Sequence, residues 1–210
     1  GLQYAVEAKE QFGIRIVNLS ITAQPTTPYF VDPVSRAVTA AWQHGLVVLA
    51  AAGNTGPTAQ SITVPGNNPY IITVGAYDTN GTAGVEKDDF VAPWSSTGPT
   101  LDGFMKPDVI APGANIPSYI YTSATNPGNS SLLAQQHPEF RSTMSMYWLN
   151  GTSMATGVAS GVVALMLQKQ PQLTPDEVKF RLMNTARSAV TDSGALIYNV
   201  FQQGSGRIWA

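Results

Sequence analysis

The sequence predicts an α/β fold, in which helices cover both faces of a mostly parallel sheet. Near-continuous apolar runs at 14–21 and 46–52 indicate strands that are buried on both faces. A helix pattern at 32–44 lies between them, so the three segments form a βαβ unit with a right-handed crossover. A third strand is expected at 70–74. With no internal repeat and no linker, the 210 residues suit one domain or a large piece of one.

Local signals place the other elements. Residues 2–12 carry apolar side chains at helical spacing, and Gly13 is suited to end that helix. The pair Asp-Pro at 32–33 marks a helix start, with Asp as N-cap and Pro in the first turn. Residues 174–177 form a capping box that begins another helix. The apolar stretch at 195–200 is a strand candidate.

Two segments lack a regular pattern. Residues 76–113 alternate turn formers with short apolar pieces, which indicates loops and edge strands. Residues 114–149 are polar apart from a few aromatic side chains, and we expect them to be an insertion.

Composition narrows the classes of function. Only 11% of residues are charged and the net charge is −2, with no run of Lys or Arg, so neither nucleic acid nor an anionic membrane is an expected partner. The absence of cysteine excludes a disulfide scaffold and a cysteine metal site. The longest apolar run is shorter than the roughly 20 residues that span a bilayer. We expect the chain to be part of a longer, secreted protein, because it starts inside a helix pattern and carries little charge.

The strongest chemical signal lies at 150–167, where Asn-Gly-Thr-Ser leads directly into an apolar helix. Ser153 is therefore expected at a helix N-terminus, where free backbone N–H groups and the helix dipole favour a developing anion. A serine nucleophile needs an exposed hydroxyl beside such donors. The alternative is that Thr152 or Ser153 only caps the helix.

The segment Gly-Thr-Ser-Met-Ala at 151–155 resembles the nucleophile motif of the subtilisin-like serine peptidases, or subtilases. The resemblance covers nearly the whole chain apart from 114–149 and implies a three-layer subtilisin-like fold whose N-terminal strands are missing. It also implies a serine endopeptidase that acts on polypeptides. Further stretches match the family pattern in the family's order, at 16–21, 47–54, 94–99, 106–113 and 204–208.

Roles follow from the resemblance. Ser153 would attack the scissile carbonyl, and Asn54 would donate to the oxyanion together with the Ser153 backbone N–H. Two further sets are implied: an edge for the substrate strand, and small residues that wall the S1 pocket. The members of these sets are Ser20, Ile21 and Thr22 for the strand edge, and Ala51, Ala52 and Gly53 for the pocket. Thr22 departs from the family, which often has glycine there.

The family places Asp and then His upstream of the serine, in motifs that these residues do not contain. His44 suits the C-terminal end of a helix. His137 lies in the insertion, where nothing is expected to orient it as a base. A serine without a base is a poor nucleophile, so we expect this chain alone to have little or no peptidase activity.

Three hypotheses stay open at this point. The chain is the C-terminal part of a peptidase whose Asp and His lie in an N-terminal part of the same protein. Alternatively, it is an inactive fragment that acts as a binding or structural module and self-associates through an exposed sheet edge. Thirdly, it is an unrelated α/β protein with a capping serine.

A cation is a further expectation from the resemblance, because many subtilases bind structural calcium. Asp108 and residues 64–68 resemble a weak cation site, although the sequence offers no clear oxygen cage. No other cofactor and no catalytic metal are expected.

Overall fold

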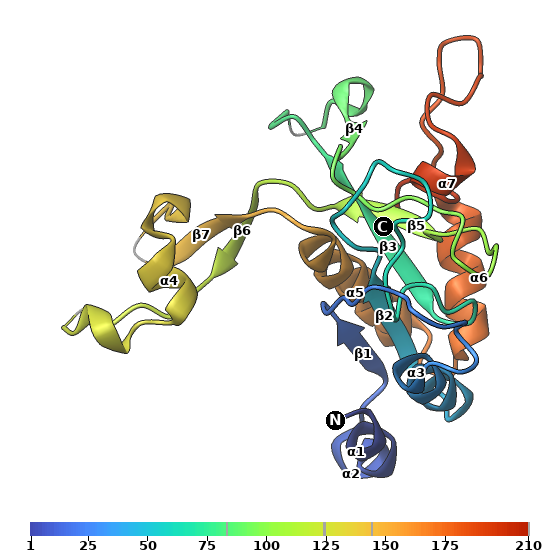
Figure 1. The fold of residues 1–210 in the computed structure, drawn as a ribbon, viewed down its shortest axis with the longest axis horizontal. Coiled ribbons are helices and arrows are strands. Elements are labelled where there is room, and N and C mark those ends of the chain that lie inside the picture. The colour runs from blue at the N-terminus through green and yellow to red at the C-terminus, as the bar shows by residue number, and fades with distance from the viewer. Residues whose placement is uncertain (83, 124, 144, 210) are drawn as a thin grey trace.

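A five-stranded, mostly parallel sheet lies at the centre of the computed structural model, which describes residues 1–82, 84–123, 125–143 and 145–209 (Figure 1). Its strand order is β1-β2-β3-β4, and β5 also pairs with β3. All pairings are parallel except that of β4, which runs antiparallel to β3. The strands are β1 (Ile16–Leu19), β2 (Val47–Ala51), β3 (Ile72–Asp78), β4 (Phe90–Val91) and β5 (Val109–Pro112).

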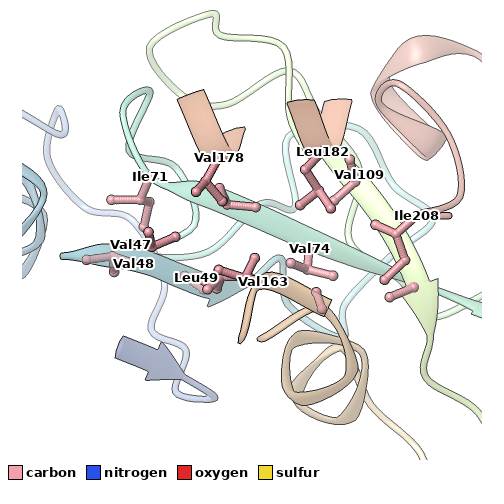
Figure 2. Close-up of a cluster of buried hydrophobic side chains, with 14 of the residues drawn as sticks. Val47, Val48, Leu49, Ile71, Val74, Val109, Val163, Val178, Leu182 and Ile208 are labelled. Carbon is pink, nitrogen blue, oxygen red and sulfur yellow. The ribbon is translucent and has the colours of Figure 1, made fainter. Parts of the chain in front are cut away.

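Helices cover both faces of this sheet, as predicted. Val163 of α5 (Thr152–Lys169) packs against one face, and Val178 and Leu182 of α6 (Pro175–Thr185) pack against the other (Figure 2). On the α6 side, α3 (Pro33–Gln43) is joined to α6 by a hydrogen bond of 2.8 Å from Trp42 Nε1 to Asp176 Oδ1. The result is the three-layer α/β arrangement.

The predicted helix signals are confirmed. The predicted N-terminal helix forms as α1 (Leu2–Glu7) and α2 (Lys9–Phe12), and α2 ends at Gly13, which adopts the left-handed conformation. Asp32 Oδ1 accepts a hydrogen bond of 2.7 Å from Ser35 N and so caps α3. The capping box of α6 is formed by Thr174 and Glu177.

Strand β1 is less buried than its apolar sequence predicts. Every residue of β2 is fully buried, whereas the residues of β1 are only partly buried or exposed. The reason is its position, because β1 pairs with β2 on one side and has no strand on its other side among the described residues. Ile16, Val17 and Leu19 still pack against the core, so the predicted strand is confirmed but is less completely covered than predicted.

Two further expectations are corrected at the C-terminal end. The segment 195–200 is not a strand, since it forms only an isolated bridge from Leu196 to Val190 and then enters α7 (Val200–Gln203). Within 76–113, β5 is a buried strand rather than an exposed edge. The end of the chain covers its outer side, where Ile208 N donates to Ile110 O at 3.0 Å.

The predicted insertion at 114–149 forms an arm that projects from the body of the molecule (Figure 1). Residues 124 and 144 of this segment lie outside the described residues. The arm is an antiparallel ribbon of β6 (Ile116–Tyr119) and β7 (Met146–Leu149), with α4 (Leu132–Gln136) beside it.

The remaining described helices are short 3₁₀ turns: η1 (Glu86–Asp88), η2 (Pro127–Asn129) and η3 (Pro138–Phe140). None of the described helices has the length and apolar character needed to cross a membrane.

The core between sheet and α6 gives a stability prediction. Leu182 is 2% exposed and packs against the sheet, whereas Leu165 on α5 is 61% exposed. We expect Leu182→Ala to lower the free energy of unfolding by about 2–5 kcal/mol, because it leaves a cavity. Leu165→Ala is the matched control and should change it by less than about 1 kcal/mol. Urea unfolding followed by circular dichroism measures both, and equal losses would contradict the assigned packing.

Candidate active site

The carboxyl ends of β1 and β2 meet the N-terminus of α5. Because Leu19 of β1 pairs with Ala50 of β2, the residues that follow these strands lie at the same edge of the sheet. Hydrogen bonds tie α5 to both ends, from Ser20 Oγ to Ser153 O at 2.9 Å and from Gly53 N to Thr152 Oγ1 at 3.2 Å. The edge of a parallel sheet beyond its carboxyl ends is the usual place for a site in an α/β fold.

Ser153 is the second residue of α5 and is partly exposed. Gly151 occupies the N-cap position, and neither Thr152 nor Ser153 makes an N-cap hydrogen bond, so the reading of Ser153 as a capping serine is wrong. Its Oγ makes one long contact, of 3.5 Å, with the backbone oxygen of Ser20. Within the described part of the chain, no acidic or histidine side chain is bonded to this hydroxyl.

Thr152 fixes the orientation of the Asn54 side chain. The Thr152 backbone N–H and its hydroxyl both donate to Asn54 Oδ1, each at 2.9 Å. Since Oδ1 is held against α5, the amide nitrogen Nδ2 is the group that Asn54 presents outward. Thr152 is fully buried, whereas Asn54 is exposed. The sequence signal for Thr152 was its place in the hydroxyl pair, but its role as a positioning residue for Asn54 was not predicted.

Two hydrogen-bond donors converge on the space beside Gly151. A Cβ atom built on Gly151 would lie 3.4 Å from Met154 Sδ, 3.5 Å from Asn54 Nδ2 and 3.6 Å from Ser153 N. Neither nitrogen has an acceptor among the residues that the structure describes, and the N–H groups of a first helical turn have none within the helix. The absence of a side chain at Gly151 thus leaves a position that lies between a side-chain donor and a backbone donor, as an oxyanion requires.

The other predicted site residues lie close by. Ala51, Ala52 and Gly53 are fully buried behind Asn54. Ile21 and Thr22 follow Ser20 and are exposed, with Ile21 at 58%. Within the described part of the chain, the N–H and C=O groups of Ile21 and Thr22 form no backbone hydrogen bond.

Both histidines are engaged elsewhere. His44 follows the C-terminal end of α3, where its Nδ1 lies 2.8 Å from Ala40 O. His137 lies in the arm, where Nδ1 is 2.9 Å from Glu139 Oε1 and the ring stacks on Phe140. The hydrogen bond from His137 also lowers the pKa of the Glu139 carboxyl. These contacts give neither histidine an orientation toward Ser153.

Known proteins match this chain over most of its length. A family model described as the subtilase family matches residues 1–206. The serine protease AprX of Bacillus subtilis (strain 168) is 47% identical over 153 residues, which make up 73% of this chain and 33% of AprX. Subtilisin DY of Bacillus licheniformis is 32% identical over 187 residues, or 86% of this chain and 53% of that protein.

Among solved structures, Sphericase aligns with a TM-score of 0.71 at 23% identity, covering 99% of this chain and 61% of that one. At this identity the likeness shows the fold alone, and the fold is that of a subtilisin-like protease. The chain spans less than two thirds of the length of each of these relatives.

Gly53 gives a prediction about the site's backbone. Its φ is +115°, and an added Cβ would lie 2.6 Å from Ser96 Oγ and 2.7 Å from Thr63 Cγ2. We expect Gly53→Ala to destabilise the chain by about 1–3 kcal/mol, through backbone strain and crowding. At Gly157 in α5 an added Cβ would meet no atom within 4 Å, so we expect Gly157→Ala to stabilise the chain by about 0.5–1 kcal/mol. Chemical denaturation of the pair would contradict this view if both changes had the same sign.

Proposed function

This chain belongs to the subtilase family of serine proteases, and we propose that it is the serine-bearing part of an endopeptidase. In this proposal an upstream part of the same protein supplies the Asp and His of the catalytic triad. The observation that carries the proposal is that two donors from different elements, Asn54 Nδ2 and Ser153 N, lie 3.5 and 3.6 Å from the same point beside Gly151. A capping serine does not need a second donor from another element.

The chemistry would be acyl transfer. Ser153 Oγ attacks the scissile carbonyl carbon of a polypeptide and loses its proton to the histidine from upstream. The carbonyl oxygen becomes an oxyanion and accepts hydrogen bonds from Ser153 N–H and Asn54 Nδ2. The histidine then protonates the leaving amine, and water hydrolyses the acyl-enzyme by the reverse proton path. Thr152 is a positioning residue in this scheme, because its two hydrogen bonds keep Nδ2 directed at the oxyanion.

Substrate binding would use the exposed backbone after β1. A peptide lying along Ser20, Ile21 and Thr22 would extend the sheet at its free side, as in strand addition. The buried run of Ala51, Ala52 and Gly53 would wall the pocket for the residue before the scissile bond, since small side chains leave room. The side chain of Thr22 would hinder backbone pairing with that peptide, because the family often has glycine at this position. Secretion of the parent protein stays a prediction.

The free side of β1 supports the upstream part as a partner. An uncovered strand edge invites pairing, so one further strand from the parent protein would pair with β1 itself and leave residues 20–22 to the peptide. The same feature supports the second candidate function, an inactive module that self-associates through this edge. The two differ in chemistry, because only the first gives Ser153 a base.

A serine-hydrolase probe tests the main proposal. We expect a fluorophosphonate to label Ser153 in the full-length parent protein but not in the 210-residue chain, because the base lies upstream. Ser153→Ala should abolish labelling of the parent. Ser160→Ala is the matched control, since Ser160 lies on the same helix and donates to Asn18 Oδ1 at 3.1 Å. A folded parent that is not labelled would exclude the peptidase and favour the self-associating module.

The oxyanion donor gives a kinetic prediction. In the parent protein, Asn54→Leu keeps the approximate shape and removes the amide N–H. We expect kcat to fall by about 10²–10³ with KM little changed, because the lost hydrogen bond forms in the transition state. Asn184→Leu serves as a control, because Asn184 is an exposed amide on α6, outside the proposed site. Steady-state kinetics on a peptide substrate separates the two constants, and a change confined to KM would contradict the assigned role.

A further inference from the structure

Two lysines and one aspartate form a cluster beside the N-terminal ends of β3 and β5. Lys106 is 1% exposed and Asp108 is 5% exposed, and their side chains pair at 2.6 Å. Lys179 reaches the same carboxylate from α6, with Nζ at 3.2 Å from Asp108 Oδ1. Two positive groups thus meet a single buried negative one, which is an unusual balance because an excess buried charge is costly.

Backbone oxygens supply the rest of the cluster. Lys179 Nζ donates to the carbonyl oxygens of Pro69, Tyr70 and Ile71 at 2.8, 3.0 and 3.0 Å. Lys106 Nζ also donates to Ile71 O, at 2.9 Å. The Lys179 ammonium therefore sits among three carbonyl oxygens and a carboxylate oxygen. This donor set of carbonyls and carboxylate is the kind that holds a hard cation such as Ca²⁺ or Na⁺.

The carboxylate has little capacity left for a metal. Asp108 Oδ2 accepts from Lys106 and from the backbone N–H of Thr73, at 2.6 and 2.7 Å. Oδ1 faces Lys179. In the 64–68 region, Gly66 O accepts from Thr73 Oγ1 at 2.6 Å. The Asp108 carboxylate and the Gly66 carbonyl are thus committed to donors of the chain itself, and they do not fit a bound metal ion.

Burial lowers the pKa of Lys106 to about 7, against the opposing attraction of Asp108, and the Lys179 ammonium lowers it further. Above that pH the cluster tends toward a neutral ion pair of Lys179 and Asp108. An uncharged Lys106 amine retains two N–H donors, which match its two acceptors, Ile71 O and Asp108 Oδ2. The geometry is therefore satisfied in either protonation state.

We propose that Lys179, assisted by Lys106, is a built-in cation that fills the Asp108 site and makes a structural metal ion unnecessary there. The inference concerns the chain's own architecture and does not depend on the peptidase proposal. Its structural consequence is a tie between α6, the segment before β3 and the segment before β5. Through Thr73 the same cluster supports the turn at Gly66, and Thr63 before that turn donates to Ala52 O.

Calcium binding to the chelator-treated 210-residue chain tests this proposal. Lys106→Glu combined with Lys179→Met removes both ammonium groups and adds a second carboxylate. We expect equilibrium dialysis to show one more bound calcium per chain in this double variant than in the wild type. An equal number in the two folded proteins would overturn the proposal, since either the wild type would already hold a metal there or the site would not suit a cation.

Thermal unfolding covers the case in which the double variant does not fold. The single variant Lys179→Met should lower the unfolding midpoint by roughly 6–20 °C, because it removes the donor to Pro69 O and Tyr70 O and the ammonium that faces Asp108 Oδ1. Added Ca²⁺ or Na⁺ should restore part of that loss. Lys169→Met is the matched control, because Lys169 is exposed at the end of α5. A midpoint for Lys179→Met equal to that of Lys169→Met would overturn the proposal.

Discussion

The pair of hydrogen bonds from Thr152 to Asn54 Oδ1 sets the geometry around Ser153. One bond comes from the backbone and the other from the hydroxyl, so the amide is held in a single orientation. The first residue of α5 is thereby joined to the end of β2, and Ser20 joins the same helix to the end of β1. Removing this constraint would free the Asn54 amide to rotate, and Nδ2 would no longer face the space beside Gly151.

The buried residues behind this contact are small because several backbones approach one another there. Ala51, Ala52 and Gly53 lie between α5 and the turns at 63–66 and 95–96. Side-chain volume at these positions would separate β2 from α5. The same close packing explains why a polar group such as the Thr152 hydroxyl can be fully buried, since it donates to Asn54 and accepts from Gly53.

Charge is used sparingly in this chain, and the few buried charges are concentrated at one place. Lys106, Asp108 and Lys179 lie on the side of the sheet away from Ser153's helix, where α6 packs. Each ammonium is satisfied by carbonyl oxygens as well as by the carboxylate. Such a network connects α6 to the N-terminal ends of β3 and β5 and so fixes their relative positions.

Sequence patterns were reliable where a local cause fixes the structure. Asp32 and Thr174 cap their helices because each side chain reaches a backbone N–H within three residues. Patterns failed where a distant segment decides the outcome. β1 has the apolar sequence of an interior strand but lies at an edge, and β5 is buried because the chain's end, at Ile208, covers it.

By itself, the sequence determined the layered α/β fold, the helix that carries Ser153 and the pairing of Ser153 with Asn54 as candidate site residues. Periodicity, capping residues and a contiguous motif are all properties of short stretches of sequence, so they can be recognised without the structure. Only the tertiary structure decided that Thr152 orients Asn54, and that Lys179 meets Asp108 from another layer. Those contacts join residues 98 and 71 positions apart, and their geometry depends on how the sheet and helices pack rather than on spacing in the chain.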